Sequence, residues 1–70
     1  MNSDLLEELR SFRQSLRDLK AGNLKQMRWY DREMSGSSMS DFMRGLAVGK
    51  ECAISRLELM IRIMELRDET

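Results

Sequence analysis

Ser35-Gly36-Ser37-Ser38 lies in the middle of the 70-residue sequence and is its strongest break. The chain contains no proline, and it is dominated by residues that favour helices, such as alanine, leucine, methionine, glutamate and arginine. The sequence therefore predicts two helices, over about 4–34 and 39–68, joined by a turn at 35–38. Their matching lengths suit an antiparallel two-helix hairpin, so the expected fold class is all-α in a single domain.

Apolar residues in the first half recur at spacings of four and three, which predicts one apolar seam along a helix. They are Leu5, Leu9, Phe12, Leu16, Leu19, Met27, Tyr30 and Met34. Asp4 and Glu7 form a start that resembles a capping box. Gly22-Asn23 is either tolerated inside one helix or marks an end and a restart. Because the apolar phase is kept across this pair, we favour one continuous helix, with or without a kink.

The second half is apolar on most sides of its predicted helix. Ser38 or Ser40 is the expected N-cap, and Asp41 suits the positive end of the helix dipole. One apolar row, with Lys50 in one slot, contains Met39, Met43, Leu46, Ala53, Leu57, Met60 and Met64. Another side carries Val48, Cys52, Leu59, Ile63 and Leu66. A helix that is apolar around most of its girth needs several neighbours, and the first half supplies only one.

This excess of apolar surface predicts self-association. A core of this size is worth only a few kcal/mol. A single cysteine and no histidine exclude an intrachain disulfide and the usual zinc sites. Two hairpins related by a two-fold axis would form a four-helix bundle with the second helices at its centre. The expected oligomer interface consists of Phe42, Gly45, Leu46, Gly49, Ala53, Leu57, Met60 and Met64.

Within that interface, Gly45, Gly49 and Ala53 form a ridge of small residues that lets another helix approach closely. The alternatives are a groove left open for a ligand or a weakened helix. A phosphate-binding loop at 45–51 is excluded, because the spacing is one residue short and Glu51 stands where a hydroxyl is required.

Catalytic motifs are missing, since no histidine is present to act as a base for a nucleophile. Cys52 lies between apolar positions, so we expect a buried, inert thiol. The glutamates are interpreted as solvated helix faces with partners one turn away. These are Glu7, Glu8, Glu51, Glu58 and Glu65. We therefore expect no enzymatic activity, no catalytic residues, no metal and no cofactor.

A basic stripe along the first helix is the candidate binding site for a partner or ligand. It consists of Arg10, Arg13, Arg17, Lys20, Arg28 and Arg32, with Trp29 beside its end. Arginine suits bidentate pairing with carboxylate or phosphate. A solvated face is the simpler interpretation of the stripe. An exposed tryptophan beside arginines is typical of an interface anchor, but it also suits stacking on a nucleotide base or packing against another copy.

The sequence combines small size, zero net charge and two helices without an enzymatic motif. In these respects it resembles the small accessory proteins that bacteriophages use to inhibit or retarget host proteins. The resemblance implies a homo-oligomeric interaction module that binds another protein and inhibits or redirects it.

Two alternatives stay open. One is an oligomer that sequesters an anionic nucleotide, or a nucleic-acid-associated regulator, although zero net charge is atypical of DNA binders. The other is that self-association is the whole function. No apolar run approaches the roughly 20 residues that span a bilayer, and a lone cysteine fits a reducing compartment. We expect a cytoplasmic protein without a membrane partner.

Overall fold

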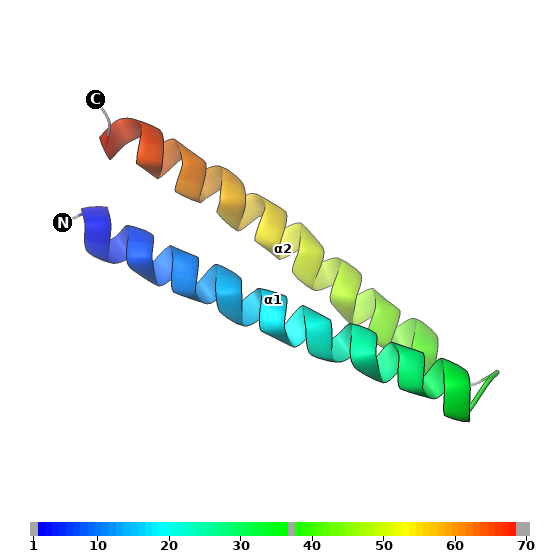
Figure 1. Ribbon diagram of the computed structural model, residues 1–70. Coiled ribbons are helices and arrows are strands. Elements are labelled where there is room, and N and C mark those ends of the chain that lie inside the picture. Colours follow the sequence, from blue (N-terminus) through cyan, green and yellow to red (C-terminus); the bar gives the residue numbers. More distant parts are fainter. Residues whose placement is uncertain (1, 37, 69–70) are drawn as a thin grey trace.

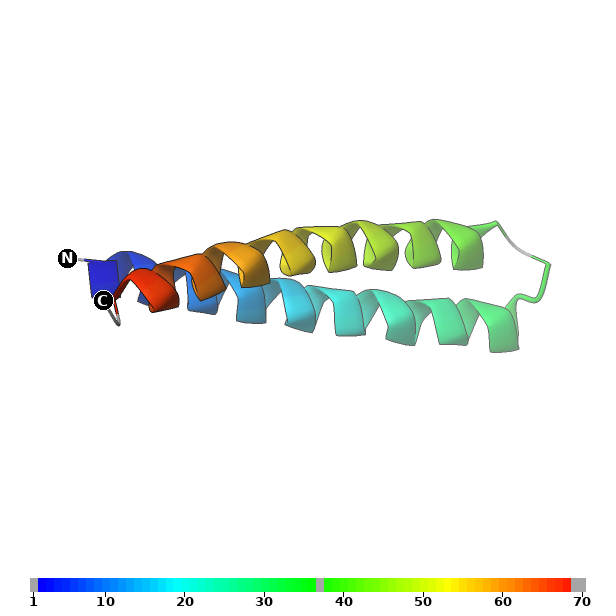
Figure 2. The ribbon, with the colours of Figure 1, turned by 90° about the horizontal axis from the view of Figure 1, so that it is seen from above.

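The structure, a computed structural model, describes residues 2–36 and 38–68. It contains two long helices, α1 (Asn2–Glu33) and α2 (Met39–Asp68). They run antiparallel and side by side along their whole length, with both termini at one end and the turn at the other (Figures 1 and 2). The predicted helical hairpin is therefore confirmed.

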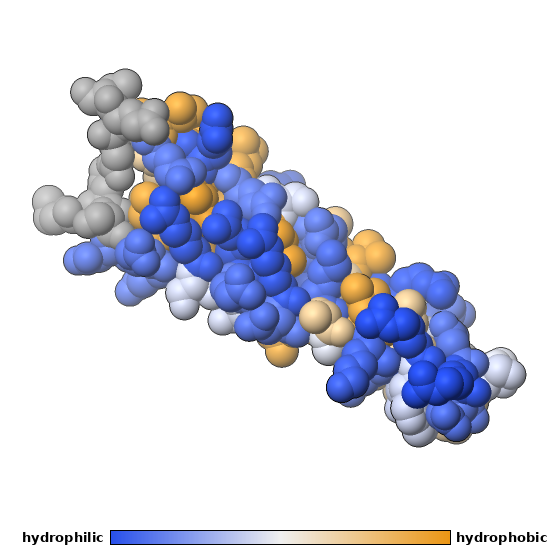
Figure 3. Space-filling model, in the orientation of Figure 1, coloured by the Kyte–Doolittle hydropathy of each residue, from blue (hydrophilic) through white to orange (hydrophobic). Residues whose placement is uncertain are grey.

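The hairpin is a thin rod of 53 × 15 × 11 Å. Its radius of gyration is 16.0 Å, whereas a compact domain of this length has a value of about 11 Å. A rod has a large surface for its volume, so much of the chain lies at the surface. On the face seen in Figure 3, hydrophilic residues cover most of the surface and hydrophobic residues appear as separate patches among them.

The turn begins where α1 ends at Glu33, and Gly36 adopts a positive φ of 90°. The amide of Met34 still donates to the carbonyl of Tyr30 at 2.9 Å. The amide of Phe42 donates to the carbonyl of Ser38 at 3.0 Å, and α2 begins at Met39. Of the two expected N-caps, Ser38 therefore takes the position directly before the helix.

α1 passes through Gly22 without a break, which confirms the favoured prediction of one continuous helix. A Cβ atom built on Gly22 would meet nothing within 4 Å. Packing against α2 therefore does not require glycine at this position.

The interior of the hairpin is small and comes mostly from α2. The buried hydrophobic residues are Leu6, Ala47, Ile54, Leu57 and Ile61. Ala47, Ile54 and Ile61 recur every seven residues, which keeps one row of α2 facing α1 in a coiled-coil-like contact. This row differs from the apolar rows predicted for the second helix, of which only Leu57 is among the buried residues.

α1 is rotated relative to the predicted seam. Leu9, Leu16, Met27 and Tyr30 are half-buried against α2, but the remaining members of the predicted seam are exposed. The exposed members are Leu5, Phe12, Leu19 and Met34.

Polar side chains occupy part of the contact between the helices instead. Arg13, Lys20 and Asn23 are half-buried there. Asn23 Oδ1 accepts a hydrogen bond of 2.6 Å from Nζ of Lys50 in α2. Nearer the turn, the hydroxyl of the buried Ser40 donates to the carboxylate of Asp31. These bonds satisfy polar groups within the contact and oppose a sliding of one helix along the other.

Two glycine substitutions are expected to change stability in opposite directions. Gly22→Ala should raise the free energy of unfolding by about 0.5–1 kcal/mol, because glycine is costly inside a helix. Gly36→Ala should lower it by about 1–2 kcal/mol, because alanine disfavours the left-handed backbone conformation. Urea unfolding at one fixed protein concentration measures both changes. A stabilising effect at Gly36 would contradict the turn geometry.

Candidate protein-interaction surface

Three ion pairs join the helices along one long side of the hairpin. Arg10 Nη2 lies 2.9 Å from Glu65 Oε2, and Arg17 Nη2 lies 2.5 Å from Glu58 Oε1. These two pairs come from positions that recur every seven residues in each helix. The third pair joins Lys20 Nζ to Glu51 Oε2 at 2.5 Å. We call this edge the ion-paired side.

The glutamates of α2 thus differ from their prediction as solvated residues with partners one turn away. Glu51, Glu58 and Glu65 instead reach across to the basic residues of α1. The antiparallel register places each opposite a cation, which helix periodicity alone could not reveal.

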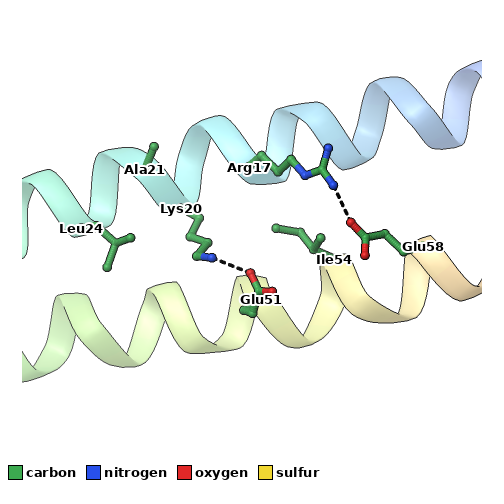
Figure 4. A pocket seen from close by; sticks show the side chains of 7 residues that line it. All are labelled: Arg17, Lys20, Ala21, Leu24, Glu51, Ile54 and Glu58. Carbon is green, nitrogen blue, oxygen red and sulfur yellow. Dashed lines mark hydrogen bonds and ion pairs between the residues drawn. The ribbon is translucent and has the colours of Figure 1, made fainter.

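A shallow groove runs between two of these pairs, with Ile54 at its floor (Figure 4). It is lined by Arg17, Lys20, Ala21, Leu24, Glu51, Ile54 and Glu58. Both basic side chains of the groove point toward carboxylates and are joined to them (Figure 4). An anionic ligand would have to compete with these carboxylates, so the groove does not favour binding of a nucleotide.

The residues of the predicted basic stripe have different surroundings in the structure. Arg10, Arg17 and Lys20 pair with α2, and Arg32 pairs with its neighbour Glu33 at 3.1 Å. Arg13 turns into the contact between the helices, where its Nε is buried without a hydrogen-bond partner among the described residues. The stripe is therefore not one continuous array of exposed cations.

Arg28 and Trp29 remain exposed near the turn end of the hairpin. Tyr30 is half-buried, and its ring meets the Trp29 ring edge to face, with centroids 5.0 Å apart and planes at 86°. This contact restrains the indole while nearly half of its surface stays accessible. An ordered, exposed tryptophan is suited to anchoring a partner.

The opposite long side of the hairpin is apolar. Leu5, Phe12 and Leu19 recur every seven residues and lie roughly 160° around α1 from the cations at positions 10 and 17. In α2 the same angle separates the paired glutamates from a row that contains Leu46, Ala53 and Met60. Because the ion pairs fix one side of both helices, these two rows lie together on the other. We call this the apolar side.

Every residue of these two rows is exposed. Phe12 retains 55% of its accessible surface and Met60 retains 51%. A neighbouring row of α2 adds Phe42, Gly49 and Ile63, with the charged Arg56 between the last two, and all four are exposed. The hairpin therefore presents a continuous apolar strip drawn from both helices.

The predicted oligomer-interface residues fall into two groups. Leu57 is buried and Met64 is half-buried against α1, so both belong to the contact within the hairpin. For these two the prediction needs correction, because their row faces α1. The other residues of the predicted interface lie exposed on α2, and they are Phe42, Gly45, Leu46, Gly49, Ala53 and Met60.

Gly45 and Gly49 face open space, since a Cβ atom on either would meet nothing within 4 Å. α1 is therefore not the helix that the ridge of small residues was predicted to admit. Cys52 also differs from its prediction, because it is exposed rather than buried. Val48 and Leu59, which precede and follow it in the predicted apolar row, are exposed on the same outer part of α2.

Within residues 2–36 and 38–68, no group of three or more cysteine, aspartate or glutamate side chains is arranged to hold a metal ion. Over the same residues, neither helix is long and apolar enough to cross a bilayer. Comparison with known proteins finds no family model, no curated protein and no solved structure that matches the chain.

The ion-paired side is expected to add little stability, because its side chains are about half exposed. Arg17→Glu should lower the free energy of unfolding by about 1 kcal/mol, and adding Glu58→Arg should recover most of that loss. Arg28→Glu is the matched control, since the described residues show no ion pair for it. Urea unfolding of the unmodified chain, Arg17→Glu, Glu58→Arg and the double variant gives the coupling energy. A coupling near zero would mean that the Arg17–Glu58 pair does not form in solution.

Proposed function

We propose that this chain is a non-enzymatic helical interaction module that self-associates through its apolar side and binds another protein, which it inhibits or redirects. The observation that carries the proposal is the exposed strip formed by two rows of residues from both helices. These residues are Leu5, Phe12, Leu19, Leu46, Ala53 and Met60. Extended apolar patches on small proteins mark binding surfaces, because their exposure to water is unfavourable.

A four-helix bundle made of two hairpins would cover this strip. In such bundles each helix contacts more than one neighbour, and α2 has apolar residues on both its inner and its outer parts. The small interior, with five buried hydrophobic residues among those described, supports the same assembly, because so small a core contributes little stability by itself.

The surface left for a second kind of partner lies near the turn, at Trp29 and Arg28. Tryptophan and arginine are the residues that most often carry the binding energy of protein interfaces. The internal ion pairs of Arg10, Arg17 and Lys20 favour a protein partner over a free nucleotide. A cytoplasmic location is part of the proposal, since the exposed thiol of Cys52 is unpaired.

Sedimentation equilibrium of the purified chain tests the proposal. We expect a mass of twice the 8.2 kDa of one chain at micromolar concentrations. The melting temperature should rise with protein concentration, because association stabilises the folded state by mass action. Molar salt should not dissociate the assembly, since screening weakens ion pairs and leaves apolar contacts intact. A cooperatively folded monomer at millimolar concentration would refute self-association.

A further inference from the structure

The apolar side changes in character along α2. Its first half carries Gly45 and Gly49, where the structure has open space beyond the backbone. Its second half contains no glycine and exposes the larger side chains of Leu59, Met60 and Ile63. The first half also exposes Phe42, Leu46 and Val48, so its recesses are confined to the two glycines.

We propose that a second copy of this chain occupies the apolar side, with the two α2 helices antiparallel and a two-fold axis passing beside Ala53. This inference rests on the proposed function and adds the geometry of the assembly to it. A two-fold axis at that point sets the first half of one α2 against the second half of the other. The recess at Gly49 then faces a larger side chain of the second copy, and Phe42 lies at the level of Ile63, so each half of the interface repeats the contacts of the other.

The spacing of the exposed residues agrees with this axis. Leu46 and Met60 lie seven residues on either side of Ala53 in the same row. In the neighbouring row, Gly49 and Arg56 lie at equal distances from the midpoint between residues 52 and 53. The arrangement therefore places the long side chain of Arg56 beside Gly49 of the second copy. Its aliphatic stem can cover the glycine while the guanidinium reaches solvent.

The area that the hairpin exposes fits one further hairpin as the occupant of the apolar side. The hairpin exposes 5387 Å², whereas a compact monomer of the same mass exposes roughly 4,500 Å². The excess is comparable to the ~800 Å² that each partner buries in a standard protein interface. One further hairpin, laid along the apolar side, is enough to cover it.

The charge of the chain also favours a second copy. Its 12 basic and 12 acidic residues give zero net charge, so two copies approach without net repulsion. Two rows lie at the centre of the apolar side, one of Leu5, Phe12 and Leu19 and the other of Leu46, Ala53 and Met60. Neither row contains a charged residue. A strongly charged partner would find no complementary group in these rows.

Single-cysteine chains test the geometry. In a Cys52→Ser background, Ala53→Cys, Leu46→Cys, Met60→Cys and the outward-facing control Ser55→Cys are each refolded and oxidised mildly. In the proposed dimer, two copies of position 46 lie about 21 Å apart along the axis, far beyond the ~7 Å that a disulfide allows between Cα atoms. Positions 46 and 60 of different copies, and position 53 of both copies, lie at the same level.

We expect Ala53→Cys to form a disulfide-linked dimer by itself. A mixture of Leu46→Cys and Met60→Cys chains should give roughly tenfold more crosslinked dimer than either chain alone, because disulfide formation depends steeply on distance. Self-crosslinking of each chain at positions 46 and 60 would show a parallel arrangement and overturn the inference, while leaving the proposed self-association intact. Monomeric chains throughout would refute both.

Isotope-filtered NMR of the unmodified chain supplies a measurement that no substitution can disturb. A mixed dimer of labelled and unlabelled copies should show contacts between the methyl groups of Leu46 and the methyl group of Met60 of the other copy. Contacts from Leu46 to Leu46 of the other copy would overturn the antiparallel geometry. A dimer without intermolecular contacts at Leu46, Ala53 and Met60 would show that another surface is buried.

Discussion

Ile61→Ala is expected to lower the free energy of unfolding by about 2–5 kcal/mol, because it leaves a cavity in the contact between the helices. Ile61 is only 2% exposed, the lowest value among the buried hydrophobic residues. It belongs to the row of α2 that faces α1 along the hairpin. The expected loss is a large part of the stability available to a chain of this size, so the unfolding midpoint should move to a much lower urea concentration.

Ile63→Ala is the matched control, since it removes the same atoms two residues further along the same helix. Ile63 is 44% exposed and lies beside the apolar side. Urea unfolding of both variants at two protein concentrations, a hundredfold apart, separates their roles. We expect Ile61→Ala to lower the unfolding midpoint at both concentrations and Ile63→Ala to lower it mainly at the higher one. If both variants lowered the midpoint equally at both concentrations, Ile61 and Ile63 would not differ in burial within the hairpin, which would contradict the structure.

The hairpin itself could be predicted from the sequence because its signals are local. Ser35-Gly36-Ser37-Ser38 breaks the helical pattern, and residues that favour helices fill both halves. The retained apolar phase across Gly22 correctly predicted a continuous α1. Such features depend on neighbours in the sequence and not on which surfaces meet in space.

The rotation of each helix could not be predicted in the same way. In α1, Leu9 and Leu16 lie between two surfaces. One surface contacts α2, and the other is the exposed row that contains Phe12 and Leu19. Periodicity identifies the whole strip but not the part of it that the partner helix covers. α2 is apolar on most sides, so its row through Ile54 and Ile61 had no clear advantage over its neighbours.

The ion pairs depend on the register between the helices, which periodicity does not contain. Arg17 and Glu58 are 41 positions apart in the sequence, and only the antiparallel arrangement brings them together. The exposed state of Cys52 was missed for a related reason, because apolar neighbours in the sequence were taken to be buried. In this hairpin Val48 and Leu59 of the same row are exposed.

Phe12→Glu is expected to abolish self-association at micromolar concentrations. Phe12 is 55% exposed in the hairpin, so its loss removes little packing within one chain, but it lies at the centre of the α1 row on the apolar side. Replacing an aromatic residue that anchors an interface costs about 2 kcal/mol or more. A symmetric dimer contains the residue twice, so the dissociation constant should rise by roughly a thousandfold. Sedimentation equilibrium measures this change directly.

Ser11→Glu introduces the same charge one residue earlier, on the part of α1 that faces away from both α2 and the apolar side. It should leave the mass of the assembly unchanged, so equal dissociation of both variants would point to helix electrostatics and not to the apolar side. Circular dichroism during dilution adds a second criterion. Because only five hydrophobic residues are buried in the part of the chain that the structure describes, a Phe12→Glu chain that cannot associate should also lose helix content. Loss of mass and of helicity together would mean that folding and assembly are one process, in which the surface exposed by a single hairpin becomes the interior of the assembly.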